Sequence, residues 1–265
     1  MGIFRLIMAF RKFFGGMLLV SISLTGCNAQ ETITPPSDLT FVGNIDPAST
    51  SKLIGESRGP AKRLVITSMG GDIASAIIIG KLVREKGLAV IVRGYCLSAC
   101  AHFIFMPASE KLVEDNSIVG FHGTASARLD LFKLARRNDL AIDYSDLANM
   151  EKRFYQETGI NDRFLIYPLT KVSPVCYLVW TTSRPLPSGK SGVITRSSFY
   201  IPSKQELGRF GSSRISGFWP TTITELIAAA SRLPQSARLT FRLAGSEETS
   251  GGQLQSVEEC PVSFP

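Results

Sequence analysis

The stretch that decides the fold reads LVITSMGGDIASAIIIGKLVREKGLAVIVRGYCLSACAHFIFMP over residues 64–107 and closes with SIVGFH at residues 117–122. Short β-branched segments alternate here with turns and with apolar residues at helical spacing. Residues 64–67 and 88–92 are predicted strands, and a helix is predicted after Asp72, which is a suitable N-cap. Strands that are apolar throughout are typical of parallel sheets with helical connections. The sequence therefore predicts an α/β fold with a mostly parallel sheet.

A serine lies in the second turn of this pattern. Ser98 follows the strand at residues 88–92 and precedes an apolar helix predicted over residues 101–106. A serine at such a turn presents its hydroxyl at a helix N-terminus, where unpaired N–H groups and the helix dipole favour a developing negative charge. The backbone amides of Gly71 and Ala99 are our candidates for the two donors of an oxyanion hole. Glycine at position 71 would let the backbone approach a substrate carbonyl closely.

A serine nucleophile needs a base, and the chain contains two histidines. His102 lies among apolar residues on the same predicted helix as Ser98, so we expect it to pack against them or to snorkel toward solvent. His122 ends the predicted strand over residues 117–121 and is the candidate base. The glycine pair, the serine turn and His122, each taken alone, are more often structural than catalytic. Their joint order within one α/β pattern is what favours a Ser98–His122 pair.

The order of strand, SMGGD turn, helix, strand, serine turn, helix, strand and histidine resembles the proteolytic subunit of Clp protease and the wider Clp protease/crotonase superfamily. It is most similar to exported Clp-like proteins whose serine lies in a Cys-x-Ser-Ala-Cys turn. The resemblance covers about residues 39–195. It implies a Clp protease/crotonase-like spiral of β-β-α units, with Ser98 and His122 as catalytic residues and the oxyanion glycine in the turn at residues 68–71. An extended peptide would add as a strand near Gly70 and Met69.

The sequence departs from the family at the third member of the triad. The family has an aspartate shortly before the segment that returns to the sheet, and residues 171–180 contain no acidic residue. Asp162 lies too far upstream. The sequence therefore predicts a dyad, and loss of an orienting carboxylate can lower turnover by about four orders of magnitude. A non-catalytic protein with the same fold is the alternative.

The N-terminus is typical of a signal peptide. Basic residues precede the apolar segment at residues 17–24, and residues 24–27 (LTGC) resemble a bacterial lipobox whose cysteine, Cys27, becomes lipidated. An uncleaved anchor or an ordinary signal peptide is the alternative. Each interpretation predicts a location in the bacterial cell envelope, either as a membrane-anchored lipoprotein on the periplasmic side or as a soluble periplasmic or secreted protein.

We expect four segments along the chain: a signal peptide over residues 1–26, a tether over residues 27–38, the Clp-like domain over residues 39–195, and a small αβ extension over residues 196–265. The tether is polar and contains proline. The extension lies outside the resemblance, and the sequence assigns it no role.

Four cysteines follow Cys27, namely Cys96, Cys100, Cys176 and Cys260. An even number in an oxidising compartment favours two disulfides. We prefer Cys96–Cys100 with Cys176–Cys260, because these would clamp the turn around Ser98 and staple the C-terminal tail. A zinc site is an alternative, but the spacing after Cys100 does not fit paired zinc knuckles. A cysteine nucleophile at Cys96 or Cys100 is a less favoured alternative.

Charge gives no strong indication of a partner. Removal of residues 1–26 takes away Arg5, Arg11 and Lys12, which reduces the formal charge from +7 to +4. No basic run with interleaved aromatic residues occurs, so nucleic-acid binding is not indicated. We expect no metal and no cofactor, and the chain contains no ATPase motif.

These observations favour an ATP-independent serine hydrolase of the envelope, specifically a peptidase acting on extended or unfolded peptides. The expected partners are a peptide or protein substrate and the membrane, through the N-terminal lipid or signal anchor; a homo-oligomer stays open. A non-catalytic peptide-binding or scaffold lipoprotein is the main alternative. A crotonase-type acyl-thioester enzyme is a third, but the presence of both Ser98 and His122 argues against it.

Overall fold

The structure is a computed structural model that describes residues 38–134, 138–172, 197–234, 239–245 and 249–251. All of them belong to one compact unit. Its elements in chain order are β1 Leu39–Val42, α1 Pro47–Glu56, β2 Arg63–Ser68, α2 Ile73–Glu85, β3 Ala89–Leu97, the π-helical turn η1 Ala101–Phe105, β4 Lys111–Val113, β5 Ile118–Gly120, α3 Ala125–Leu134, α4 Asn138–Thr158, the 3-10 turns η2 Asp162–Leu165 and η3 Tyr167–Lys171, β6 Ser197–Ile201, α6 Lys204–Arg209, β7 Ile215–Gly217, α7 Ile223–Ala230, β8 Leu239–Leu243 and β9 Thr249–Gly251.

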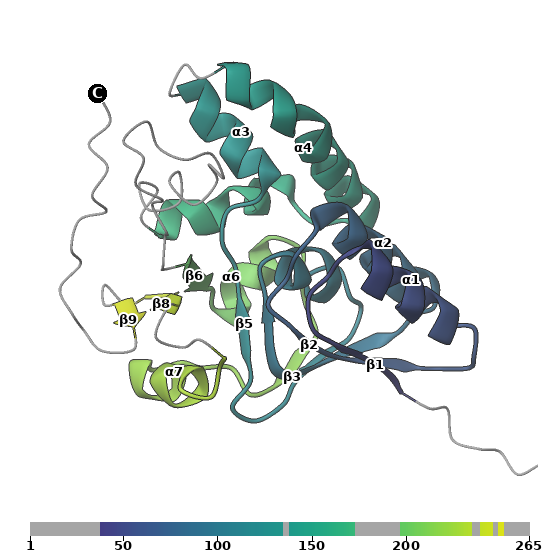
Figure 1. Cartoon of the computed structure of the whole chain (residues 1–265). Coiled ribbons are helices and arrows are strands. Elements are labelled where there is room, and N and C mark those ends of the chain that lie inside the picture. Colours follow the sequence, from purple (N-terminus) through teal and green to yellow (C-terminus); the bar gives the residue numbers. More distant parts are fainter. Residues whose placement is uncertain (1–37, 135–137, 173–196, 235–238, 246–248, 252–265) are drawn as a thin grey trace, which may run out of the picture. The chain divides into compact units, whose positions relative to one another are not determined.

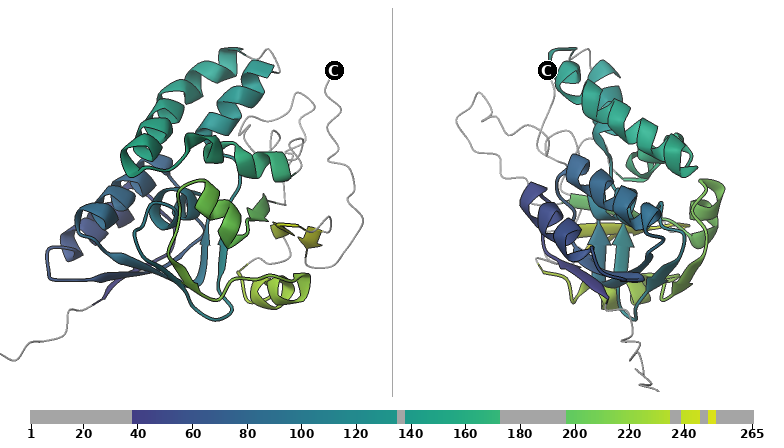
Figure 2. Two further views of the ribbon diagram at one scale, coloured as in Figure 1. Left: turned by 180° about the vertical axis from the view of Figure 1, so that it is seen from behind. Right: turned by 90° about the vertical axis from the view of Figure 1, so that its right-hand side faces the viewer.

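The main sheet has the strand order β1-β2-β3-β4-β7, and every pair in it is parallel. Strand β5 pairs with β3 as well, also in parallel. The predicted α/β class with a mostly parallel sheet is confirmed. Helix α1 lies beside α2, α2 contacts α4, and α4 pairs with α3 (Figure 1, Figure 2). Among the described residues, no helix is both long and apolar enough to span a membrane.

Helix α2 begins where the sequence predicts it. The side chain of Asp72 accepts a hydrogen bond from the backbone N–H of Ser75 at 2.8 Å, which satisfies a donor that the helix cannot pair itself. One face of the helix is buried, because it packs against α1, α4 and η1. This burial explains the small and apolar residues on that face.

Strand β3 is longer than the sequence predicts. It continues through Leu97, although a turn was expected from Arg93 onward. The register with β2 shifts between Ile66 and Ser68, and Gly94 has a φ of 78°, as in a β-bulge. The bulge lets one strand serve two partners, β4 before it and β5 after it. The apolar run alone does not reveal this change of partner.

The residues of the expected C-terminal αβ extension contribute side chains to the same core as the rest of the described chain. Strand β7 pairs with β4 and completes the main sheet, while β6, β8 and β9 form a second sheet. The buried ammonium of Lys111 in β4 donates to the carbonyls of Ala108 and Ser213. Without β7, the three residues of β4 would present an open sheet edge. The expected boundary at residue 195 itself lies outside the described residues.

Helix α2 packs so closely on η1 that Gly80 has no room for a side chain. A Cβ atom at Gly80 would lie 2.0 Å from the carbonyl oxygen of Phe103 and 2.8 Å from the ring of Phe154. We therefore expect Gly80→Ala to lower the free energy of unfolding by about 1–3 kcal/mol, although alanine favours helix. Gly55→Ala in α1 is the matched control, since no atom lies within 4 Å of its Cβ position.

Urea unfolding of both variants measures the difference. The control should be unchanged or slightly stabilised, by up to about 1 kcal/mol. Equal stabilities for the two variants would contradict the close approach of α2 to η1.

Candidate active site

Ser98 has an unusual backbone conformation at the junction of β3 and the following helix. Its φ is 56°, in the left-handed region that residues other than glycine seldom adopt. Such a conformation costs on the order of 1–3 kcal/mol and is found mainly at functional sites. Ser98 is half-buried, whereas its neighbours Leu97 and Ala99 are buried. The turn thus brings one hydroxyl toward the surface from a buried segment.

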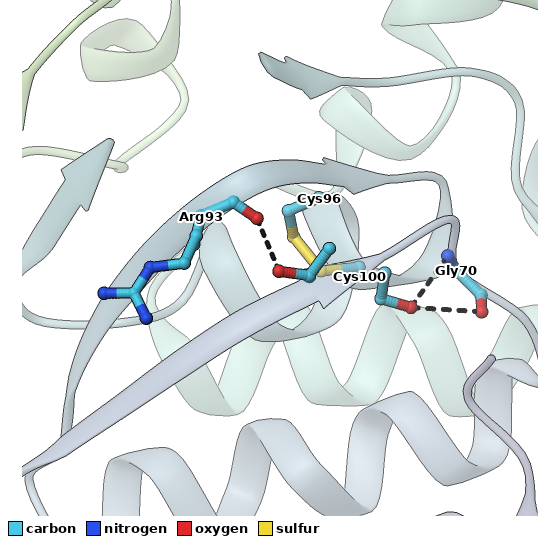
Figure 3. The surroundings of a disulfide bond; sticks show 6 residues. Gly70, Arg93, Cys96 and Cys100 are labelled. Carbon is cyan, nitrogen blue, oxygen red and sulfur yellow. Dashed lines mark hydrogen bonds between the residues drawn. A yellow bond between two sulfur atoms is a disulfide. The ribbon is translucent and has the colours of Figure 1, made fainter. Parts of the chain in front are cut away.

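A disulfide spans this turn. Cys96 and Cys100 are bonded, with their Cα atoms 5.3 Å apart, and both are fully buried (Figure 3). This pairing was predicted. Because both sulfur atoms are in the bond, neither can ligate zinc or act as a nucleophile, which removes those two alternatives for this pair. Cys27, Cys176 and Cys260, with their predicted lipidation and pairing, lie outside the described residues.

The Gly-Gly turn after β2 lies directly against the serine turn. A Cβ atom at Gly70 would be 2.7 Å from Cβ of Ser98 and 3.0 Å from the amide nitrogen of Ala99. Gly70 has a φ of 99°, and its N–H donates to the hydroxyl of Ser68 at 3.1 Å (Figure 3). Only glycine permits both this backbone conformation and this approach. Met69, the other residue expected to face substrate, is half-buried and packs against the core.

The amide of Gly71 is directed by its pairing with Ile45. The N–H of Ile45 donates to Gly70 O at 2.9 Å, and the N–H of Asp72 donates to Ile45 O at 2.8 Å. In a parallel bridge of this kind the central residue, here Gly71, turns its own N–H to the opposite side. Ala99 is the first residue of a helix, so its N–H has no partner within that helix. Neither amide has a hydrogen-bond partner among the described residues.

His122 follows β5 and contacts Ser98 directly. Its Nε2 lies 2.5 Å from Oγ of Ser98. The ring of Phe199 packs on the imidazole, with centroids 5.0 Å apart, and His122 is only 5% exposed. Burial, together with the electrostatic influence of His102 and Arg128, lowers the pKa of His122 to about 3. The imidazole is therefore neutral at physiological pH and can accept a proton at Nε2.

His102 packs in the core rather than snorkelling toward solvent. It is 1% exposed, and its ring bonds to the hydroxyl of Tyr155 and to the backbone carbonyl of His122. Burial lowers the pKa of His102 to about 4. Its ring nitrogens are thus occupied by other partners than Ser98, so it is not the base in this arrangement.

The strand beside His122 is β6. Phe199 of β6 packs on the imidazole, and Tyr200 pairs through its backbone with Phe121. The sequence of β6 is SSFYI, which has no carboxylate. Asp162 begins η2, after α4. Most of the segment at residues 171–180, where the family has its aspartate, lies outside the described residues.

Sequence reasoning missed a buried carboxylate near the site. Glu151 in α4 is fully buried and accepts hydrogen bonds from the N–H groups of Ala125 and Ser126 and from the hydroxyl of Ser126. Burial raises its pKa. The available signal was spacing, because Glu151 falls at i+3 and i−4 from Ala148 and Tyr155 on the buried face of α4. This carboxylate binds the segment that follows His122.

Comparison with protein-family models and with curated proteins finds no match to this chain. Within the part of the chain that the structure describes, no group of three or more His, Cys, Asp or Glu side chains could hold a metal ion. The chemistry of the site therefore has to be argued from the geometry of Ser98, His122 and the nearby amides.

The two buried histidines should make the stability depend on pH. Their folded-state pKa values of about 4 (His102) and about 3 (His122) lie below the usual value near 6.5. The unfolded chain therefore takes up protons that the folded chain excludes, so stability is full above about pH 6.5 and falls as the pH drops. At pH 5 each histidine should cost about 2 kcal/mol of unfolding free energy.

Urea unfolding at pH 7, 6 and 5 tests this expectation. His122→Ala should lose about half of the histidine-linked pH dependence. The difference between wild type and this variant cancels the contribution of the carboxylates. A difference that does not change between pH 7 and 5 would refute the buried, neutral state of His122.

Proposed function

We propose that this chain is an ATP-independent serine hydrolase, a peptidase that acts on extended or unfolded peptides and is related to the Clp protease/crotonase superfamily. The observation that carries the proposal is the 2.5 Å contact between His122 Nε2 and Ser98 Oγ, with Ser98 held in a left-handed strand-to-helix turn. A nucleophile within hydrogen-bond reach of its base is the arrangement that acyl transfer requires. In this proposal the sheet and its helices form the family's β-β-α spiral.

The reaction begins when Ser98 Oγ attacks the substrate carbonyl and His122 Nε2 accepts the hydroxyl proton. The N–H groups of Gly71 and Ala99 donate to the oxyanion of the tetrahedral intermediate. His122 then returns the proton to the leaving amine, which leaves an acyl group on Ser98. Water attacks this ester with His122 as base, and the acid product departs as Ser98 regains its proton.

The substrate would bind as an added strand beside the Gly70–Gly71 turn. A peptide in this position places its carbonyl between the two donor amides. The chain has no ATPase motif, so unfolded or short peptides are the substrate class. The proposed location is the bacterial envelope, with residues 1–26 as signal peptide and a lipid on Cys27 as the membrane anchor. A homo-oligomer is compatible with this proposal.

The low pKa of His122 favours slow turnover. A base with a pKa of about 3 takes a proton from serine less readily than an ordinary imidazole. The described residues of β6, which flanks His122, contain no acidic residue. The low pKa of His122 also supports a second candidate function, a non-catalytic lipoprotein that binds peptides beside the Gly70–Gly71 turn.

Labelling with a fluorophosphonate probe separates the two functions. The full chain, purified in detergent, should be labelled covalently, whereas Ser98→Ala and His122→Ala should not be. Ser51→Ala is the matched control, because this serine is exposed on α1 and should leave labelling unchanged. An unlabelled wild type that is folded would contradict the hydrolase and favour the binding protein.

The pH dependence of labelling provides an independent check. An imidazole with the usual pKa near 6.5 would be about three-quarters protonated at pH 6, and labelling would fall to about a quarter. Because the pKa of His122 is about 3, the rate should be the same at pH 6 and pH 8. A fourfold decrease at pH 6 would show that His122 is not shielded from solvent during labelling.

A further inference from the structure

Helix α4 presents two buried polar side chains to the region around His122. Glu151 and Tyr155 are both 0% exposed and lie four residues apart, so they share one face of the helix. Buried polar groups are costly unless they are bonded, and both of these are. Their partners lie on η1, which follows Ser98 in the chain, and at the start of α3, which follows His122.

Tyr155 connects to His122 through His102. The carbonyl oxygen of His122 can only accept, so His102 Nε2, 2.8 Å away, carries the proton and donates. The neutral His102 ring then accepts at Nδ1 from the hydroxyl of Tyr155, which is 3.0 Å away and shares its proton with the carbonyl oxygen of His102 at 3.2 Å. The lowered pKa of His102 agrees with this neutral tautomer. A chain of two hydrogen bonds thus runs from α4 to the backbone of His122.

His102 is tied to the nucleophile as well. Its own N–H donates to the carbonyl oxygen of Ser98 at 3.0 Å. One residue therefore bonds the backbone of Ser98 through its main chain and the backbone of His122 through its side chain. His102 thus links the backbones of the candidate nucleophile and base.

Glu151 bonds to the start of the helix that follows His122. Its two carboxylate oxygens accept from the N–H groups of Ala125 and Ser126 at 2.9 and 2.7 Å, and from the hydroxyl of Ser126 at 2.7 Å. These residues begin α3, three residues after His122. A carboxylate at a helix N-terminus satisfies donors that the helix leaves unpaired. The segment after His122 is therefore fixed to the same helix face as Tyr155.

We propose that Tyr155 and Glu151 are positioning residues that orient His122 toward Ser98 through its backbone, with His102 as the link. The inference rests on the proposed hydrolase function. In a serine triad an acidic residue orients the imidazole through its Nδ1–H. The contacts from α4 act instead on the backbone of His122, at its carbonyl oxygen and at the helix that follows it.

Tyr155→Phe tests the relay with little change in volume. It removes the hydroxyl that His102 Nδ1 accepts, and we expect the maximal labelling rate of Ser98 to fall about fivefold, as for the loss of one buried hydrogen bond. The probe concentration for half-maximal rate should not change. Tyr167→Phe is the matched control, because Tyr167 also loses one hydroxyl, bonded to Glu206, but does not contact His102.

His102 supplies a rescue test. His102→Leu removes the donor to His122 O and should lower the rate about tenfold or more. His102→Gln places an amide N–H near the former Nε2 and should retain most of the wild-type rate. If His102→Leu does not fold, the positioning role is tested by two other comparisons. These are the labelling rates of Tyr155→Phe and Tyr167→Phe, and the labelling rate of His102→Gln relative to wild type. Equal rates for Tyr155→Phe and wild type, or equal losses in Tyr155→Phe and Tyr167→Phe, overturn the positioning role.

A readout without turnover separates this inference from the proposed function. The chain has two histidines, so its imidazole NMR spectrum contains two ring systems, and His122→Ala assigns them. The His122 ring resonances should shift in Tyr155→Phe and remain in place in Tyr167→Phe. If wild type is not labelled, the hydrolase proposal fails, yet this shift would still support the link from α4. Unchanged His122 resonances in Tyr155→Phe would overturn the link, whether or not Ser98 reacts.

Discussion

The left-handed backbone of Ser98 is the constraint on which the site depends. A single residue in this conformation is unfavourable, so several contacts have to hold it. The Cys96–Cys100 disulfide closes the turn, Gly70 packs against it, and the N–H of Ser98 donates to Gly120 O at 3.0 Å. These contacts come from three separate elements, so the turn is fixed by the sheet as a whole.

The base is held by parts of the chain that are distant in sequence. His122 follows strand β5 of the main sheet, Phe199 of the second sheet packs on its ring, and α4 bonds to His102 and to the residues that begin α3. This enclosure excludes water and keeps both histidines neutral. Close contact with Ser98 and weak basicity of His122 therefore have one physical origin, the dense packing around the imidazole.

The sequence predicts those parts of the site that depend on local patterns. The order of strands and helices follows from short-range periodicity, and Asp72 is a local cap. Ser98 and His122 meet because parallel strands end at one edge of the sheet. Long-range features escape such reasoning. Arg93 and Gly94 interrupt the apolar run and look like the end of a strand, yet β3 continues through them to a second partner. Glu151 looks like an ordinary charge until its buried partners are known.

The pairing of β4 with β7 bears on how the chain reaches its native state. Ser216 in β7 bonds to Lys111 in β4 across 105 residues of sequence. Contacts between such distant residues form slowly, because a long loop must close first. Until β7 has emerged from the ribosome, β4 lacks its outer partner in the sheet. The main sheet would therefore be completed late in synthesis, when β7 becomes available to pair with β4.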